Sequence, residues 1–336
     1  MFYLPAPPKD FQPIADYRRL PGEVAGILSP RLAFEIRAAQ ERRDLGLALL
    51  EDLGDEPPRF TRRWSLAQAP EIVAAELRTL LDVSLETQAT WKDPRLAYNA
   101  WRDRLEALGV LVFQTPTQAR LPVKEFRGLA IASEVLPIIL LNAKDATAGR
   151  SFSLMHELAH IAVRESAITD YSLSTADAPR DKHAQMVEVF CNRVAAAVLM
   201  PKQAFLAHPA VGNKRGADWT NDDLRGLAEA FGVSPEAIVR RLLTFGRTTE
   251  AFYKKKREEY KAARDKFEAE QKKKKKKRGG PPPYRAALGH LGAGFAKLIL
   301  QNYYQQRITL NDAAGYLGLK LPQMAKLEAE AYKRAA

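Results

Sequence analysis

Apolar residues recur along the chain at two different spacings, and the change between them predicts the order of secondary structure. Helical spacing runs from about Arg31 to Gly109, with proline and glycine residues between successive helices. Short β-type runs separated by turn residues follow at 110–113, 128–131 and 138–141. Helical spacing returns from about Ser151 onward. We therefore expect a mostly helical α+β fold with a small β-sheet.

The helices expected after the sheet are also separated by breaking residues. An apolar helix from His183 to Met200 ends at Pro201. Residues 222–231 and 235–245 have the spacing of a helix-turn-helix. A charged helix follows and is broken by glycines and prolines at 279–283. Further helices are predicted near 285–305, 309–317 and 321–334.

These breaks divide the chain into four expected parts. They are a proline-rich arm with a charged helix (1–60), the main domain (61–250), a basic helix and linker (251–283), and a helical C-terminal segment (284–336). The last segment has helix-turn-helix-like spacing but offers only Lys320, Gln323 and Lys326 for reading bases. A structural or partner-docking tail is therefore favoured there.

The net charge of +12 is concentrated in one segment. Residues 254–278 hold 14 basic and 5 acidic residues, or +9, which leaves +3 for the rest of the chain. The candidate nucleic-acid contacts are the side chains of Lys272, Lys273, Lys274, Lys275, Lys276, Lys277 and Arg278. No aromatic residue interrupts that run to stack on bases, so a solvated helix or linker is the favoured interpretation.

Cysteine content and hydropathy indicate a cytoplasmic protein. The single cysteine, Cys191, excludes an internal disulfide framework and fits a reducing compartment. No apolar run approaches the roughly 20 residues that a membrane-spanning helix needs. The N-terminus also lacks the basic and apolar regions of a secretion signal.

The sequence His156-Glu157-Leu158-Ala159-His160 opens the helical region after the predicted sheet. Histidines four residues apart share one helical face, so both imidazoles can bind one metal ion. Neutral imidazole suits zinc, which polarises a carbonyl group. Glu157 can then accept a proton from water and return it to the leaving amine. The motif predicts hydrolysis of a peptide bond.

A catalytic zinc site has three protein ligands, so one more must come from elsewhere in the chain. A third histidine six residues after His160 is absent, because Ser166 stands there. Glu188 is the strongest candidate, since a carboxylate on so apolar a helix is costly to bury without a cation. An exposed Glu188 is the alternative, and Cys191 is a weaker candidate ligand.

Three further residues are candidates for contacts with the substrate. Arg150 and Tyr171 could stabilise an oxyanion. His183 could donate a hydrogen bond in the transition state, although a plain surface position is the simpler interpretation.

A longer pattern surrounds the motif. It comprises Asn142, residues 150–154 leading into the motif, and residues 188–192 running on to Leu199-Met200-Pro201. This pattern resembles the ImmA/IrrE family of bacterial and phage metallopeptidases over roughly residues 95–250. The resemblance implies a zincin-like domain with zinc at the positions of His156, His160 and Glu188, and with Glu157 as base.

The resemblance also implies a partner. Members of that family act on, or lie beside, helix-turn-helix repressors and relieve repression after stress or phage signals. A protein substrate, either such a repressor or an antitoxin, is therefore expected. Many longer relatives carry a repressor-like domain ahead of a stretch similar to residues 2–8, where this chain starts. That domain is then a separate polypeptide, unless the true start lies upstream or the chain is a natural fragment.

Two other functions are compatible with the sequence. In the first, the protein is a DNA-associated transcriptional regulator whose zincin domain is a binding or signalling module with little proteolysis. The lysine run and the two helix-turn-helix-like segments favour it, with any contact to nucleic acid indirect. In the second, the protein is the toxin of a toxin-antitoxin pair, which shares the peptidase chemistry but has another target.

Overall fold

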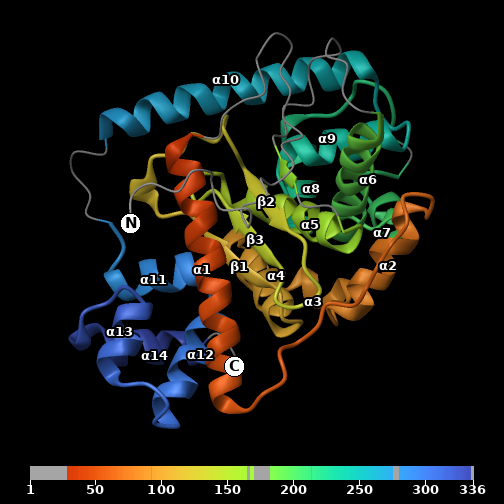
Figure 1. Ribbon diagram of the computed structural model, residues 1–336. Helices are drawn as coiled ribbons and strands as arrows, with labels where there is room; N and C mark the ends of the chain where they lie inside the picture. Colours follow the sequence, from red (N-terminus) through yellow and green to blue (C-terminus); the bar gives the residue numbers. More distant parts are fainter. Residues whose placement is uncertain are drawn as a thin grey trace, which may run out of the picture.

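A small β-sheet lies at the centre of the molecule, with helices on both of its faces (Figure 1). The computed structural model describes residues 29–91, 93–164, 167–169, 182–212, 214–274 and 280–333. Four helices precede the sheet: α1 (Pro30–Leu53), α2 (Pro70–Leu80), α3 (Leu85–Ala89) and α4 (Pro94–Ala107). Those that follow are α5 (Thr147–Ala162), α6 (Lys182–Leu199), α7 (Lys202–Ala207), α8 (Asn221–Phe231), α9 (Pro235–Thr244), α10 (Glu250–Lys274), α11 (Pro283–Leu291), α12 (Ala293–Tyr304), α13 (Leu310–Tyr316) and α14 (Met324–Lys333).

The sheet has the strand order β1-β3-β2-β4. Its strands are β1 (Leu111–Gln114), β2 (Gly128–Ile131), β3 (Ile138–Leu141) and β4 (Ala167–Thr169). β1 and β3 are parallel, and the β3–β2 and β2–β4 pairs are antiparallel. The first three strands were expected from the sequence. β4 was not, because three residues are too short a run for an apolar pattern to be recognised.

Successive side chains of the strands enter two different hydrophobic cores. Val112, Ile139 and Leu141 pack in the core formed with α2, α4, α5, α6, α8 and α9. Phe113, Ile138 and Leu140 pack in the core formed with α1 and α11 to α14. Because helices cover both faces, the strands are nearly uniformly apolar rather than alternating. The mostly helical α+β fold expected from the sequence is confirmed.

A buried ion pair on α4 joins the C-terminal helices to the rest of the molecule. Arg102 Nε lies 2.7 Å from Glu106 Oε1, with side chains 1% and 6% exposed. Arg102 also donates to the carbonyl oxygens of Gly289 and Val112. Glu106 accepts a 2.7 Å hydrogen bond from the backbone N–H of Gly294, in the first turn of α12. One pair therefore connects α4, β1 and the α11–α12 junction.

That junction corrects one sequence expectation. A single helix was predicted near 285–305, but the structure has two helices separated at Gly292. Gly292 has φ of 87°, which is incompatible with a continuing α-helix. A Cβ atom at this position would also collide with the carboxylate of Glu106. The glycine permits the close approach of the buried ion pair.

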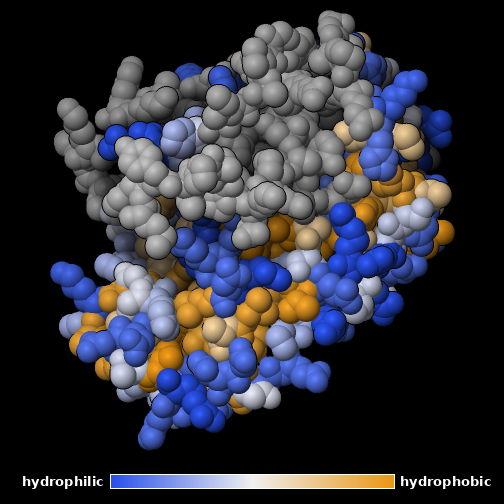
Figure 2. Space-filling view, viewed as in Figure 1, coloured by the Kyte–Doolittle hydropathy of each residue, from blue (hydrophilic) through white to orange (hydrophobic). Residues whose placement is uncertain are grey.

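The outer surface is polar around limited apolar areas. On the face in Figure 2, apolar surface lies beside the lower half of α1, where several leucines are only partly buried, and hydrophilic side chains surround it. Within the described residues, no helix combines the length and apolar character needed to cross a membrane.

The four-part division at residues 60, 250 and 283 stays a prediction, although both the first and last parts contribute to the core beneath the sheet.

Candidate metal centre

The side chains of the histidine motif lie on α5, which packs against β2, β3 and α6. His156 and His160 are four residues apart and therefore project from the same helical face. Both are fully buried. Glu188 projects toward them from α6, and its side chain remains 14% exposed. Two packed helices thus bring together residues separated by about 30 positions in the sequence.

The three side chains place their ligand atoms close to one point. The Nε2 atoms of His156 and His160 are 3.0 Å apart. The carboxylate oxygens of Glu188 lie 3.4 Å from His156 Nε2 and 3.2 Å from His160 Nε2. Ligand atoms about 2.0–2.1 Å from a tetrahedral zinc ion are separated by roughly 3.3 Å. The observed separations fit a metal ion bound by all three side chains.

The electrostatics of the cluster also fit a cation. Burial lowers the pKa of His156, which favours the neutral imidazole that binds metals. Burial would raise the pKa of Glu188, but its hydrogen bonds with His156 and His160 outweigh that effect and hold the pKa well below the ordinary value. Two imidazoles and one carboxylate form a donor set typical of catalytic zinc. Among the described residues, these three make up the single group found with metal-ligand geometry.

Glu157 lies between the two histidines in the sequence and is fully buried against the sheet. Its carboxylate lies directly over Gly128, the first residue of β2. A Cβ atom at Gly128 would be only 2.7 Å from Glu157 Oε1. Gly128 therefore provides the space that this carboxylate occupies. Sequence reasoning did not select Gly128, although a glycine within an apolar strand is a known sign of close approach.

Two residues that follow Glu188 on α6, Cys191 and Asn192, differ in their role at the site. The side chain of Asn192 donates a 2.8 Å hydrogen bond to the backbone carbonyl of Glu188. Cys191, which the sequence left as a weaker candidate ligand, is buried but does not belong to the metal-ligand group. Asn192 thus fixes the backbone at the candidate ligand.

The remaining predicted site residues lie elsewhere. Arg150 is at the start of α5, where its guanidinium contacts Gln114, Thr147 and the Tyr98 ring rather than the candidate ligands. His183 is exposed in the first turn of α6. Tyr171, Lys275, Lys276, Lys277 and Arg278 lie outside the described residues, as do the side chains of Lys272, Lys273 and Lys274. The roles assigned to these residues stay predictions.

In the helix-turn-helix-like pair α8–α9, the arginines of α9 form contacts within the molecule. Arg241 is 2% exposed, donates two hydrogen bonds to the carbonyl of Met200 and pairs with Glu71 at 2.8 Å. Arg240 donates to the hydroxyl of Tyr253 on α10 and stacks on its ring. The second helix of the pair is therefore packed as part of the domain, which does not favour base reading by these arginines.

Two histidines on a helix over a small sheet, a glutamate between them and a second glutamate from the next long helix define a metallopeptidase-like domain. Residues 105–243 match the family model of the IrrE N-terminal-like domain, a peptidase family. This segment is of the ImmA/IrrE type, as the sequence resemblance implied. The match runs from the end of α4 through most of α9 and leaves α1, α10 and the C-terminal helices outside it. No curated protein matches the chain.

Proposed function

We propose that the protein is a zinc-dependent endopeptidase that cleaves a helix-turn-helix repressor or an antitoxin. The convergence of His156, His160 and Glu188 beside the buried carboxylate of Glu157 carries this proposal. The family match supports the peptidase chemistry. The choice of zinc rests on the donor set, and the choice of substrate rests on the kind of protein that the family resemblance implies.

The residues divide the reaction between them. A bound zinc ion would supply Lewis-acid polarisation of the scissile carbonyl and would activate water. His156, His160 and Glu188 would hold the ion, and the side chains of the two histidines are fully screened from solvent. Glu157 would accept the proton of the water whose oxygen bonds to the carbonyl carbon. It would then pass that proton to the amine nitrogen as the carbon–nitrogen bond breaks.

The surface beside the cluster fits a polypeptide substrate. Glu188 is the one candidate ligand with exposed area, so the site opens on the α6 side. Val189, the residue after Glu188, is 38% exposed. An exposed apolar side chain near a polar reaction centre can contact the side chains of an extended peptide.

A single pair of measurements tests the proposal. The purified chain is expected to hold about one zinc ion and to cleave a helix-turn-helix regulator encoded beside it, or a peptide library if no such gene exists. Glu157→Gln is expected to retain zinc and to lower kcat/KM by about 10²–10⁴-fold. Glu229→Gln is the matched control, because Glu229 is exposed on α8. Normal cleavage by the Glu157 variant, or a wild-type chain that binds no zinc, would overturn the proposal.

A further inference from the structure

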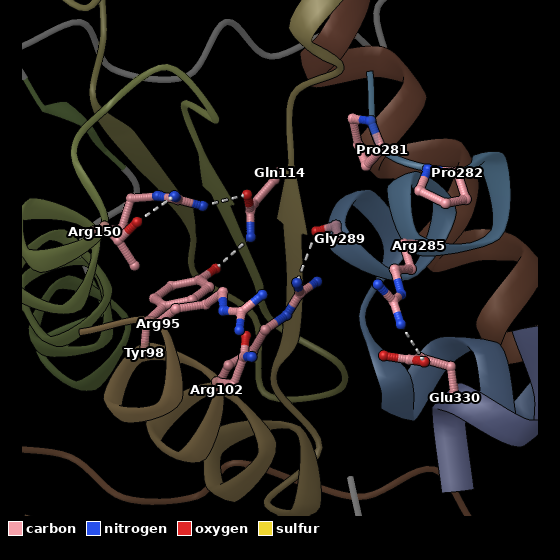
Figure 3. Close-up of a pocket in the computed structure, with 12 residues that line it drawn as sticks. Arg95, Tyr98, Arg102, Gln114, Arg150, Pro281, Pro282, Arg285, Gly289 and Glu330 are labelled. Atoms are coloured by element: carbon pink, nitrogen blue, oxygen red, sulfur yellow. Dashed lines mark hydrogen bonds and ion pairs between the residues drawn. The ribbon is translucent and has the colours of Figure 1, made fainter. Parts of the chain in front are cut away.

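A second polar site lies near the N-terminal end of α5 and is separate from the candidate metal centre. It is a cavity of about 550 Å³ between α4, the end of β1, the start of α5 and the C-terminal helices α11 and α14 (Figure 3). None of the candidate metal ligands lines it. Its lining consists of Arg95, Tyr98, Asn99, Arg102, Gln114, Thr147, Arg150, Pro281, Pro282, Arg285, Gly289 and Glu330.

Arginines dominate the charge of this cavity, and two of the four have a carboxylate partner. Arg102 is neutralised by Glu106, as described above. Arg285 faces Glu330 across the cavity at 3.5 Å, and both side chains retain solvent exposure. Arg95 and Arg150 are the other two arginines, and neither forms an ion pair with any residue that the structure describes. The lining therefore has an excess of two positive charges.

Among the described residues, Arg150 donates hydrogen bonds to neutral groups only. Its Nη1 donates to Gln114 Oε1 and its Nη2 to Thr147 Oγ1, both at 2.9 Å. Its guanidinium also lies over the Tyr98 ring, 5.2 Å from the centroid. Its Nε is buried and has no hydrogen-bond partner within the described part of the chain. Asp145 interacts with it electrostatically and pairs with Arg127 at 3.8 Å.

The charge of Arg150 is poorly compensated by its surroundings, so an anionic ligand would stabilise it. Burial lowers the pKa of its guanidinium, which means that the surroundings stabilise its charge less well than water does. Gln114 is itself fixed, because its Nε2 donates to the hydroxyl of Tyr98 at 2.8 Å. The neutral partners thus hold Arg150 in one orientation without compensating its charge. A ligand anion would supply that compensation.

Arg95 completes the site from the solvent side. It lies in the first turn of α4, exposed, one turn before Asn99 on the same helix. Figure 3 shows Arg95 beside Tyr98 and Arg102. Because Arg95 is exposed, its guanidinium can adjust to an incoming ligand. Arg150 is partly buried and held by its hydrogen bonds to Gln114 and Thr147, so it provides a fixed contact.

We propose that this cavity binds a small molecule that carries a phosphate group. A phosphate group has close to two negative charges, which match the two uncompensated arginines, and its oxygens suit two guanidinium forks at once. A single carboxylate would leave one arginine uncompensated. The cavity volume lies within the range of small-molecule sites, so it has room for a phosphate ester such as a nucleotide rather than for inorganic phosphate alone.

Binding to the full-length chain tests the proposal, with calorimetry as the readout. The probes are inorganic phosphate, ribose 5-phosphate and AMP, with adenosine and succinate as controls. We expect AMP or ribose 5-phosphate to bind and to raise the melting temperature, and adenosine to do neither. Arg95→Ala and Arg150→Lys should each weaken that binding at least about tenfold, because a charge-assisted hydrogen bond or its fork geometry is lost. Arg225→Ala, which changes an exposed arginine on α8, should leave it unchanged.

Each outcome decides for or against the site. Absence of binding by all three phosphate probes overturns the proposal. So does binding that survives both Arg95→Ala and Arg150→Lys, since the phosphate then lies elsewhere, for example on a metal ion. Succinate binding as tight as that of the phosphate esters would overturn the assignment of a phosphate ligand. If Arg150→Lys does not fold, Arg95→Ala alone decides, because Arg95 is exposed and makes no described ion pair.

Discussion

Helix α5 bears two polar sites with opposite electrostatics. Near its middle, the imidazoles of His156 and His160 converge with the carboxylate of Glu188 from α6, and Glu157 lies on the same helix. At its first turn, Arg150 is held by neutral partners, and no residue in the described ranges forms an ion pair with it. Arg150 and Glu157 are seven residues apart, which is roughly 10 Å of helix.

The difference shows how uncompensated charge indicates the chemistry of a ligand. At the metal centre the protein supplies electron-pair donors, so the group that completes the site is a cation. At the arginine-lined cavity it supplies N–H donors and positive charge, so the completing group is an anion. His156, Glu157 and His160 are fully buried, and Arg150 is partly buried.

The largest expected effect concerns Arg102, the one buried arginine of the cavity that the protein itself neutralises, through Glu106. Glu106→Gln leaves the charge of Arg102 buried and uncompensated, which should lower the free energy of unfolding by about 3–5 kcal/mol. Chemical denaturation measures the loss. The matched control is Asp82→Asn, which breaks an ion pair of Arg104 on the same helix with an aspartate that is 94% exposed. That change should cost under about 1 kcal/mol. Equal effects of the two variants would contradict this division of the arginines.

The second prediction concerns the cation side of the comparison. Glu188→Gln removes the charged ligand while keeping the size of the side chain. We expect zinc affinity to fall by at least about 100-fold, measured by competition with a chelating dye, since changes even outside the ligand set cost 10–100-fold. His183→Gln on the same helix is the control and should retain wild-type affinity, because His183 is exposed. Unchanged affinity in the Glu188 variant would mean that the third ligand lies elsewhere.

The two sites differ in how far the sequence could predict them. His156 and His160 fall within one helical turn, so their proximity follows from helix geometry alone. Glu188 needed one further argument, the cost of a carboxylate on an apolar helix, and the structure places it beside both histidines. The first three strands and the boundaries of α1, α4, α6, α8 and α9 followed from the spacing of apolar residues and from proline and glycine breaks.

The arginine-lined cavity could not be found in the same way. Its lining comes from α4, β1, α5 and the helices beyond residue 280, and no local motif relates Arg95 to Arg285. Their meeting depends on how the C-terminal helices pack against α4. The sequence pattern did not show the break at Gly292, because the need for it arises from a contact with Glu106 far along the chain. Local periodicity predicts elements, while long-range packing determines which faces meet.

Gly128→Ala tests the geometry at the metal centre without changing a polar atom. The added Cβ would lie 2.7 Å from Glu157 Oε1, so the carboxylate must move. We expect kcat/KM to fall by about 10–100-fold, since displacement of a catalytic group by about 1 Å has effects of that size. Zinc content should not change. The control is Gly226→Ala on α8, where an added Cβ meets nothing within 4 Å. An alanine variant with full activity would show that the carboxylate does not act from the position over Gly128.

The smallest expected effect is a pH dependence of stability caused by His290, whose pKa responds to the positive charge of nearby arginines. His290, next to Gly289 in the cavity lining, has a pKa lowered first by burial and then by Arg42 and Arg102. Because the pKa of His290 is lowered in the folded state, the neutral imidazole contributes its full stabilisation of the fold above the ordinary pKa of about 6.5. It is lost as the pH falls from there through the folded pKa. The stability of the wild type should therefore fall relative to that of His290→Gln between pH 7.5 and pH 5, measured by denaturation.

NMR titration of His290 links this effect to the ligand. A phosphate ester in the cavity adds negative charge near Arg102 and should raise the pKa of His290, whereas in Arg95→Ala the same ester concentration should raise it less.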